Sequence, residues 1–302
     1  MSFIQAHRPW VLAQQGVHLP LQQHPGYGDD VIQWMQKLDE GGAGEVWLGF
    51  WPRYRVRVVG KYLRETADSD ARKGFAREVR ILRRNFAGFV RVFLAGADAP
   101  RPYYVMEYFV NGPIVRWAGA LNRAQLGQVA LDASTYFAAL HRAGIAHGDI
   151  KPPNLLLGDD GRVRVADPIG CGWGCTRLFA ENRGGTPGYW APEILQGHSI
   201  APAADVWSLG ATMHHLASGL QPMDGTSFDL RYPVFGIAPE IAEIVRACCQ
   251  LDPSARPGMS DIALLLKGQS WSAIRAERQR ATVTALLGVG AAAVFLAALD
   301  TK

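Results

Sequence analysis

The chain has few of the features that mark secreted, repetitive or nucleic-acid-binding proteins. Only four of its 302 residues are cysteine, at positions 171, 175, 248 and 249, and their spacing gives no disulfide framework. The net charge is only +4 and the basic residues are not interleaved with aromatics, so we expect no nucleic-acid partner. Internal repeats and low-complexity segments are also missing. A composition that is 48% hydrophobic and 19% charged then indicates a globular protein of one large or two small domains.

Long apolar runs are missing from the start of the chain but not from its end. Residues 1–15 contain none, so we expect no secretory signal. Residues 281–299 contain no charged side chain, and as a helix they would span roughly 28 Å, close to the thickness of a bilayer core. Three arginines lie just before this run, at 275, 278 and 280. We therefore expect a single-pass tail anchor with the larger part of the chain in the cytoplasm, no sensor domain beyond the membrane, and a packed terminal helix as the alternative.

The order of the predicted elements indicates an α+β protein with a small β-rich lobe followed by a larger helical lobe. Strand patterns cover 31–38, 45–51, 55–59 and 101–110, with one helix over 71–85. Helical spacing follows over 126–140, 203–218 and 239–249, and the region 143–193 between them is rich in loops. We expect four segments: an irregular extension over 1–30, one domain over 31–268, a basic linker over 269–280 and the membrane helix over 281–299.

The first lobe carries residue types that suit phosphate binding. Gly41, Gly42 and Gly44 lie between two predicted strands, where glycine lets the backbone approach phosphate oxygens closely. Lys61, at the end of the next strand, could reach the α- and β-phosphates of a nucleotide, and Glu78 on the helix could hold it by an ion pair. A plain glycine-rich hairpin and a solvated lysine are the alternatives for these residues taken singly.

The strongest local signal is the loop His147-Gly-Asp-Ile-Lys-Pro-Pro-Asn154. Asp149 could accept a proton from a hydroxyl group, and Lys151 could stabilise charge on a transferred phosphoryl group. Asn154 and Asp167, which follows the strand pattern over 162–166, offer the amide and carboxylate oxygens that Mg²⁺ prefers. Three polar groups within six residues are difficult to explain as a solvated turn.

Over residues 31–265 the chain resembles eukaryotic-type Ser/Thr protein kinases, bacterial members included. The resemblance rests on a series of motifs in the family's order: Gly41 to Val46, Val58 to Lys61, Val105 to Tyr108 with Met106 as gatekeeper, His147 to Asn154, Ala191 to Glu193, Asp205 to Gly210, and Arg256. It implies a bilobal kinase fold, ATP and Mg²⁺ as cofactors and a protein substrate. Lys151 and Thr186 follow the Ser/Thr rather than the Tyr pattern.

The resemblance also implies a role for each site residue. Asp149 would be the catalytic base with Lys151 beside it, and Asn154 and Asp167 would bind the metal. The nucleotide would meet a larger set of residues: Gly41, Gly42, Gly44, Val46, Val59, Lys61, Glu78, Glu107, Phe109 and Leu156. Within this set, Val46, Val59 and Leu156 would sandwich the adenine, and the backbone from Glu107 to Phe109 would bond to it. Asp205 would brace the catalytic loop, and Arg256 would pair with Glu193.

Four positions depart from the family pattern. Asp39 replaces the first loop glycine and Ala43 replaces an aromatic, which predicts weaker nucleotide binding. Gly148 replaces the arginine that usually pairs with a phosphorylated activation loop, so we expect activity that survives Thr176→Ala. Pro168 replaces the phenylalanine after the metal-binding aspartate, and its fixed φ should restrict movement of this segment.

These departures leave three functions open. An active Ser/Thr protein kinase is expected because every residue with a direct chemical role is present. A pseudokinase, meaning a nucleotide-binding scaffold, is the first alternative, suggested by the changes at Asp39, Gly148 and Pro168. A small-molecule phosphotransferase is the second, since His147 to Asp149 and Asp167-Pro168 also resemble aminoglycoside and fructosamine kinases. The motifs at 191–193 and 205–207 favour a protein substrate.

Overall fold

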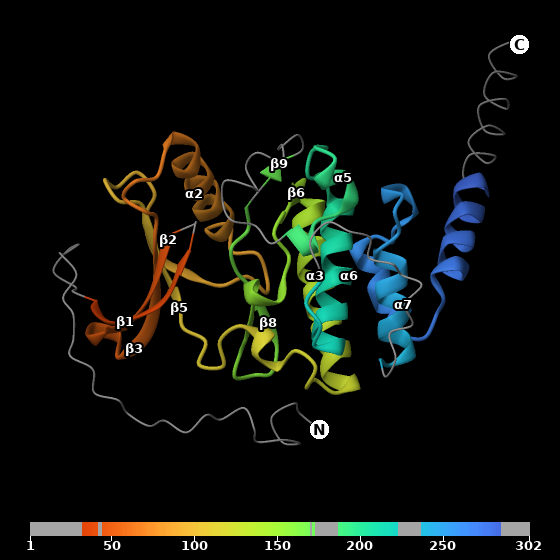
Figure 1. Cartoon of the computed structure of the whole chain (residues 1–302), viewed down its shortest axis with the longest axis horizontal. Coiled ribbons are helices and arrows are strands. Elements are labelled where there is room, and N and C mark those ends of the chain that lie inside the picture. The colour runs from red at the N-terminus through yellow and green to blue at the C-terminus, as the bar shows by residue number, and fades with distance from the viewer. Residues whose placement is uncertain (1–31, 42–43, 170, 173–186, 223–236, 285–302) are drawn as a thin grey trace, which may run out of the picture.

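The protein consists of a small lobe built on a β-sheet and a larger helical lobe (Figure 1). The computed structural model describes residues 32–41, 44–169, 171–172, 187–222 and 237–284. The presence of these two lobes confirms the α+β, two-lobed architecture expected from the sequence. The predicted extension over 1–30, most of the predicted membrane helix, and Gly42, Cys175, Thr176 and Thr186 lie outside the described residues.

The small lobe is an antiparallel sheet of five strands in the order β1-β2-β3-β5-β4. One face packs toward the second lobe and toward helix α2, and the other carries a separate cluster around Trp34, whose ring covers Gly60 so closely that a Cβ there would lie 2.3 Å from it. Helix α2 begins after Asp68, whose carboxylate accepts from the amides of Asp70 and Ala71 as an N-cap. The bounds are β1 Gln33–Gly41, β2 Gly44–Trp51, β3 Val56–Tyr62, α2 Ser69–Leu82, β4 Val92–Gly96 and β5 Tyr103–Glu107.

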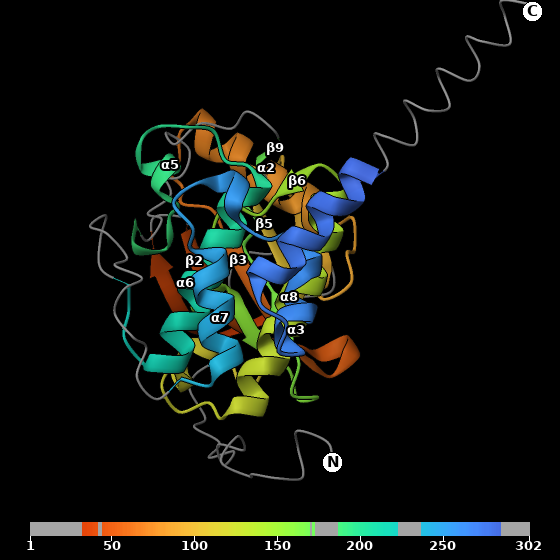
Figure 2. The same ribbon diagram turned by 90° about the vertical axis from the view of Figure 1, so that its right-hand side faces the viewer.

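The larger lobe is built from helices that lie side by side, as Figures 1 and 2 show for α3, α6 and α7. Helix α3 starts with a capping box between Asn122 and Gln125, and α6 ends at Gly219 in the left-handed conformation. The bounds are α3 Arg123–Arg142, α5 Pro192–Leu195, α6 Pro202–Ser218, α7 Pro239–Cys248 and α8 Ile262–Leu266. A further helical stretch occupies residues 271–284.

Two further sheets, each of two short strands, lie apart from the five-stranded sheet. Strand β6 (Ile145–Ala146) pairs with β9 (Cys171–Gly172), and β7 (Leu155–Leu157) pairs with β8 (Val163–Val165). They enclose the loop 147–154 between β6 and β7. Single 3-10 turns complete the described chain: η1 Pro52–Tyr54, η2 Ile114–Trp117, η3 Pro152–Asn154, η4 Pro187–Tyr189, η5 Pro253–Ala255 and η6 Met259–Asp261.

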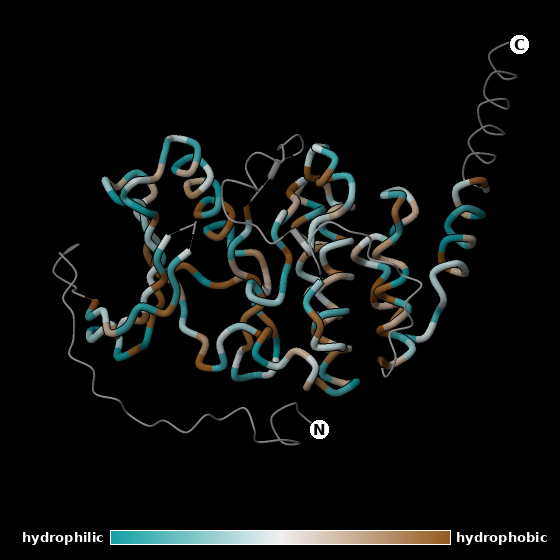
Figure 3. Tube along the Cα trace, in the orientation of Figure 1, coloured by the Kyte–Doolittle hydropathy of each residue, from teal (hydrophilic) through white to brown (hydrophobic). Residues whose placement is uncertain are grey.

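One continuous hydrophobic core runs from the inner face of the sheet through α2 into α3, α6 and α7. Hydrophobic residues recur between hydrophilic ones along α3 and α6 (Figure 3), as the helical spacing predicted. Helices α6 and α7 approach closely at Gly210, where a Cβ would lie 2.6 Å from the sulfur of Cys249. Cys248 and Cys249 are buried free thiols, as expected from their apolar surroundings.

Strand β4 was not predicted from the sequence. Phe93 and Leu94 within it are both partly exposed, so the segment lacks the alternation that marks a half-buried strand. The described residues contain no helix long and apolar enough to cross a membrane, and they include only 281–284 of the apolar run 281–299. The tail anchor therefore stays a prediction.

Candidate active site

Lys61 and Glu78 form a buried ion pair at the inner face of the sheet. Strand β3 pairs with β2 and β5 in a register that places Lys61 opposite Val46 and Tyr104. Its Nζ lies 2.7 Å from Oε1 of Glu78, and the side chains are only 5% and 2% exposed. The ion pair expected from the sequence is thus present, and it fixes α2 against the sheet.

Asp167 joins this pair from the other lobe. Its Oδ1 lies 2.8 Å from Nζ of Lys61 and accepts a 3.2 Å hydrogen bond from the hydroxyl of Tyr104. Burial alone would lower the pKa of Lys61, but the carboxylates of Asp167 and Glu78 outweigh it and raise that pKa above its ordinary value. Burial alone would raise the pKa of Asp167, yet Lys61 holds it below the usual range. Lys61 and Asp167 are therefore both charged at neutral pH.

The loop 147–154 brings together the three polar residues predicted there. Nζ of Lys151 lies 2.9 Å from Oδ2 of Asp149, and Nδ2 of Asn154 donates to the same oxygen at 2.9 Å and to the Asp149 carbonyl at 2.8 Å. Both donors meet one carboxylate oxygen, which leaves Oδ1 available to accept a proton. The turn η3, with prolines at its first two positions, sets Asn154 back toward Asp149.

A buried network holds this loop in place. The carboxylate of Asp205, on α6, accepts from the backbone amides of His147 at 2.7 Å and Gly148 at 2.8 Å. The amide of Asp149 donates to Nδ1 of His147, so the ring carries its hydrogen on Nε2 and donates it to the carbonyl of Ala166 at 3.1 Å. Burial lowers the pKa of His147, which keeps the ring neutral. The loop and the segment before Asp167 are thereby tied to each other and to α6.

Asn154 and Asp167 can serve together as metal ligands. The amide of Ala166 donates to the backbone carbonyl of Asn154 at 2.9 Å, so the two candidate ligands come from adjacent backbones. Nδ2 of Asn154 donates to Asp149, so Oδ1 of Asn154 is the side-chain atom that can bind a metal. The described residues hold no group of three or more His, Cys, Asp or Glu side chains suited to a metal. One carboxylate and one amide oxygen fit Mg²⁺ that arrives with phosphates and keeps waters, rather than a protein-enclosed metal.

The predicted nucleotide-binding residues line the inner face of the sheet. Gly41 ends β1 and Gly44 begins β2; Gly44 has φ +135°, and a Cβ there would lie 2.0 Å from the carbonyl oxygen of Tyr62, so only glycine fits. Val59 is buried in the main core, and Val46, Leu156 and Phe109 pack against it. These side chains form one apolar surface from both lobes.

Glu107 is more restricted than the sequence implied. Its amide donates to the carbonyl of Arg91 at 3.1 Å, and its side chain accepts from the Arg91 amide at 2.7 Å. An adenine at this edge of β5 would therefore have to meet the carbonyl oxygen of Glu107 rather than its N–H.

Arg256 and Glu193 form a second buried ion pair, in the larger lobe. The guanidinium meets both carboxylate oxygens, at 2.6 and 2.8 Å, and lies over the ring of Trp207. The pair ties the turn after α7 to α5, as the motifs predicted.

A sequence model described as "Protein kinase domain" matches residues 32–265, which is most of the chain. The chain belongs to the protein kinase domain family. The match covers every predicted site residue, from Gly41 to Asp167, together with the Glu193–Arg256 pair. The matched residues agree with the range 31–265 over which the motifs follow the family's order.

Curated relatives are kinases by name and are longer than this chain. The probable serine/threonine-protein kinase PkwA of Thermomonospora curvata is 32% identical over 258 residues, which are 78% of this chain and 34% of that protein. The serine/threonine-protein kinase PknL of Mycobacterium tuberculosis is 29% identical over 246 residues, 73% of this chain and 60% of PknL. The probable serine/threonine-protein kinase DDB_G0267514 of Dictyostelium discoideum is 26% identical over 83% of this chain and 30% of its own length.

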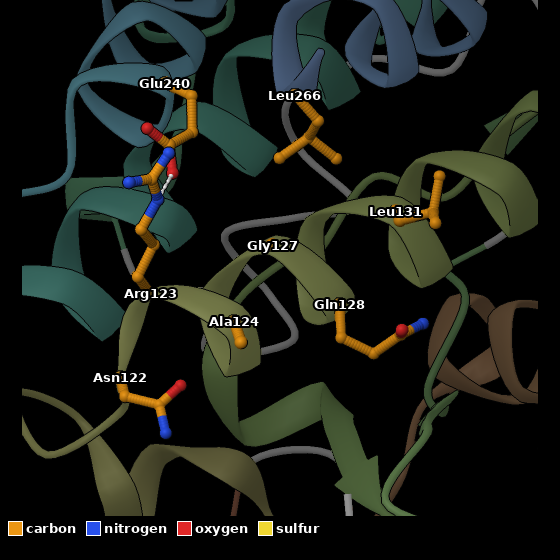
Figure 4. Close-up of a pocket in the computed structure, with 8 residues that line it drawn as sticks. All are labelled: Asn122, Arg123, Ala124, Gly127, Gln128, Leu131, Glu240 and Leu266. Atoms are coloured by element: carbon orange, nitrogen blue, oxygen red, sulfur yellow. Dashed lines mark hydrogen bonds and ion pairs between the residues drawn. The ribbon is translucent and has the colours of Figure 1, made fainter. Parts of the chain in front are cut away.

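A separate hollow of about 680 Å³ lies on the larger lobe, away from all predicted site residues. Figure 4 shows it between α3 and the segments that carry Glu240 and Leu266. Its two charged residues, Arg123 and Glu240, are ion-paired with each other. The hollow offers neither a nucleophile nor a set of metal ligands, so it adds nothing to the phosphotransfer site.

Sequence reasoning missed two participants in the site. Tyr104 carries no motif: it is one of two adjacent tyrosines in strand β5, and only the β3–β5 register places it beside Lys61. His141, on α3, contacts Oδ2 of Asp205 at 2.8 Å and adds a third partner to the carboxylate that holds the loop. A strand assignment with exact register would have been needed to find Tyr104.

Proposed function

We propose that the chain is an ATP-dependent Ser/Thr protein kinase that transfers the γ-phosphoryl group of ATP to protein hydroxyls. The observation that carries this proposal is the convergence of two groups: Lys61, Glu78 and Asp167 on one side, and Asp149, Lys151 and Asn154 on the other. The hydrogen bond from Ala166 to Asn154 joins them. This is the set that phosphoryl transfer between a nucleotide and a hydroxyl requires.

Each residue has a task that its contacts support. Oδ1 of Asp149 accepts the hydroxyl proton, while Asn154 and Lys151 hold Oδ2 and so fix the direction of the carboxylate. Lys61 is kept protonated by two carboxylates and supplies positive charge for the α- and β-phosphates. Asn154 and Asp167 would hold Mg²⁺, which when bound neutralises charge on the phosphates.

Gly148 supports activity without activation-loop phosphorylation. It presents no side chain where an arginine would pair with a phosphate group, and its backbone amide is held by Asp205 instead. The loop thus has a tether that does not depend on a modification.

The test of the proposal is transfer of labelled γ-phosphate to a generic protein acceptor. We expect Asp149→Ala to lower the rate by about 10²- to 10⁴-fold, the usual contribution of a positioned acid–base group. Asp98→Ala, which removes an exposed carboxylate of the small lobe, is the matched control. Nucleotide binding without any transfer by the unmodified chain would instead favour a pseudokinase, and transfer to small hydroxyl compounds but not proteins would favour the small-molecule phosphotransferase.

We also propose that the kinase domain works at the cytoplasmic face of a membrane, held there by residues 281–299. The support is the charge-free run in the sequence and the arginines at 275, 278 and 280 before it. Expression with and without residues 281–302, followed by membrane fractionation, tests this. Recovery of both forms in the supernatant without detergent would contradict it.

A further inference from the structure

The hydroxyl group of Tyr104 lies between the two carboxylates of the nucleotide site. It donates to Oε1 of Glu78 at 2.8 Å and contacts Oδ1 of Asp167 at 3.2 Å. The side chain has no exposed surface. A polar atom in such a position is buried only when its partners compensate for the loss of water, so these two contacts account for its presence in the core.

The aromatic ring of Tyr104 packs against Phe75 on helix α2. Its centroid lies 5.5 Å from that of Phe75, which is one turn before Glu78 on α2. Phe75 and Glu78 are three residues apart, so both point from the same face of the helix. The ring therefore packs on α2 while the hydroxyl binds it, and the register of β3 and β5 places Tyr104 directly opposite Lys61.

We propose that Tyr104 is a positioning residue: its hydroxyl is a second tether, independent of Lys61, that fixes Glu78 of α2 and orients Asp167 toward a metal. Lys61 shares its ammonium group between Glu78, Asp167 and, in the proposed function, the α- and β-phosphates. The hydroxyl of Tyr104 contacts the same two carboxylates and has no task toward the nucleotide. The inference rests on the proposed function as a nucleotide-dependent phosphotransferase.

Lys61 and Tyr104 contact the same oxygen of Asp167, which supports the orientation of this carboxylate toward a metal. Lys61 and Tyr104 both meet Oδ1, at 2.8 and 3.2 Å, which leaves Oδ2 for the metal. The Asp167 side chain is 36% exposed, so the carboxylate is not sealed off by the protein. Burial and the two neighbouring carboxylates raise the pKa of Tyr104 well above its ordinary value, which keeps the hydroxyl protonated and able to donate. Donors behind a metal ligand commonly change metal affinity by about 10- to 100-fold.

The decisive variant is Tyr104→Phe in the full chain, which removes one oxygen and keeps the packed ring. The matched control is Tyr103→Phe on the same strand, whose ring stacks on Tyr62 in the cluster on the opposite face of the sheet. Two measurements are made on each: hydrogen exchange of α2 amides without ligand, and the affinity for a non-hydrolysable ATP analogue by calorimetry with Mg²⁺ and with EDTA.

We expect Tyr104→Phe to speed exchange in residues 69–82 about tenfold, as expected for loss of a charge-assisted hydrogen bond, and Tyr103→Phe to leave it unchanged. We expect the gain in nucleotide affinity that Mg²⁺ produces to fall about tenfold in Tyr104→Phe alone, with the EDTA value retained. Wild-type exchange and wild-type Mg²⁺ dependence in Tyr104→Phe would overturn the inference and leave Tyr104 as core packing.

The proposed function and the role of Tyr104 are tested by different measurements. If the unmodified chain bound no nucleotide in either buffer, the proposed function would be wrong, and with it the role toward the metal. The exchange measurement needs no ligand, so it would still decide whether Tyr104 tethers α2.

Discussion

The carboxylate of Asp205 holds the backbone of Gly148 in a left-handed conformation. Oδ1 accepts from the Gly148 amide at 2.8 Å, and φ at this glycine is +83°. The two residues are 57 positions apart, one in α6 and one in the loop that carries Asp149. The backbone immediately before the proposed base is therefore set by a buried charge in the larger lobe, with no contribution from a side chain at position 148.

Asp205→Ala should destabilise the fold strongly. It leaves the buried amides of His147 and Gly148 without their acceptor, at about 1–3 kcal/mol each, so we expect a loss of about 3 kcal/mol in the free energy of unfolding. Asp205→Asn keeps one acceptor oxygen and should lose less. Urea denaturation measures both, and a loss below about 1 kcal/mol for Asp205→Ala would show that the loop is held by other contacts.

Gly148→Ala should reduce both stability and phosphoryl transfer. A left-handed φ costs a residue with a Cβ roughly 1–2 kcal/mol, and that Cβ would lie 3.4 Å from Ile200, in ordinary contact. The strain, rather than a clash, would displace the adjacent Asp149. Gly197→Ala is the matched control, because Gly197 has φ +90° and no atom within 4 Å of a Cβ. We expect similar losses of stability in thermal unfolding but reduced transfer only in Gly148→Ala; equal activity in the two variants would contradict this.

The sequence predicts the fold where local pattern and burial agree. The predicted helices over 126–140, 203–218 and 239–249 correspond to α3, α6 and α7 to within three residues at each end, because long amphipathic stretches signal strongly. Strand β4 was missed because Phe93 and Leu94 lie at an exposed edge of the sheet, where alternation is lost.

Motifs predict site residues only where several of these residues lie close together in the sequence. The loop 147–154 concentrates Asp149, Lys151 and Asn154 within six positions, so its chemistry is visible without a structure. The members of the Lys61–Glu78 pair are 17 residues apart, so residue type and predicted elements suggested the pair but left a solvated lysine as the alternative. Tyr104 could not be predicted at all: its importance arises from β-sheet register and from the meeting of two lobes, neither of which leaves a local pattern.

Arg256→Lys should be destabilising although it conserves charge. Lysine cannot meet both oxygens of Glu193 or reproduce the bond from Nε of Arg256 to the carbonyl of Gln250. Because the pair is buried, we expect a loss of about 3 kcal/mol in urea denaturation. Arg246→Lys is the control, since Arg246 pairs with Glu243 at the surface and should lose less than about 0.5 kcal/mol. Similar values for both variants would mean that the geometry of the Arg256 pair is unimportant.

His147 should make stability depend on pH in the weakly acidic range. The buried ring is neutral in the folded protein, where burial lowers its pKa, but in the unfolded chain it takes up a proton near its ordinary value of about 6.5. The unfolded state then binds more protons, so stability is fully present above about pH 6.5 and falls as the pH drops toward the folded pKa. Each group of this kind contributes a slope of up to about 1.4 kcal/mol per pH unit.

His147→Gln isolates this contribution, because His214 and His215 also have lowered pKa values through burial and add to the wild-type slope. Glutamine can still donate to the carbonyl of Ala166 but does not titrate. We expect His147→Gln to be less stable than wild type at pH 7.5 and to lose less stability than wild type between pH 6.5 and 5. His198→Gln, at an exposed position, should retain the wild-type slope. Urea denaturation across this range measures the difference, and parallel pH profiles for wild type and His147→Gln would show that the folded protein accepts a proton on His147.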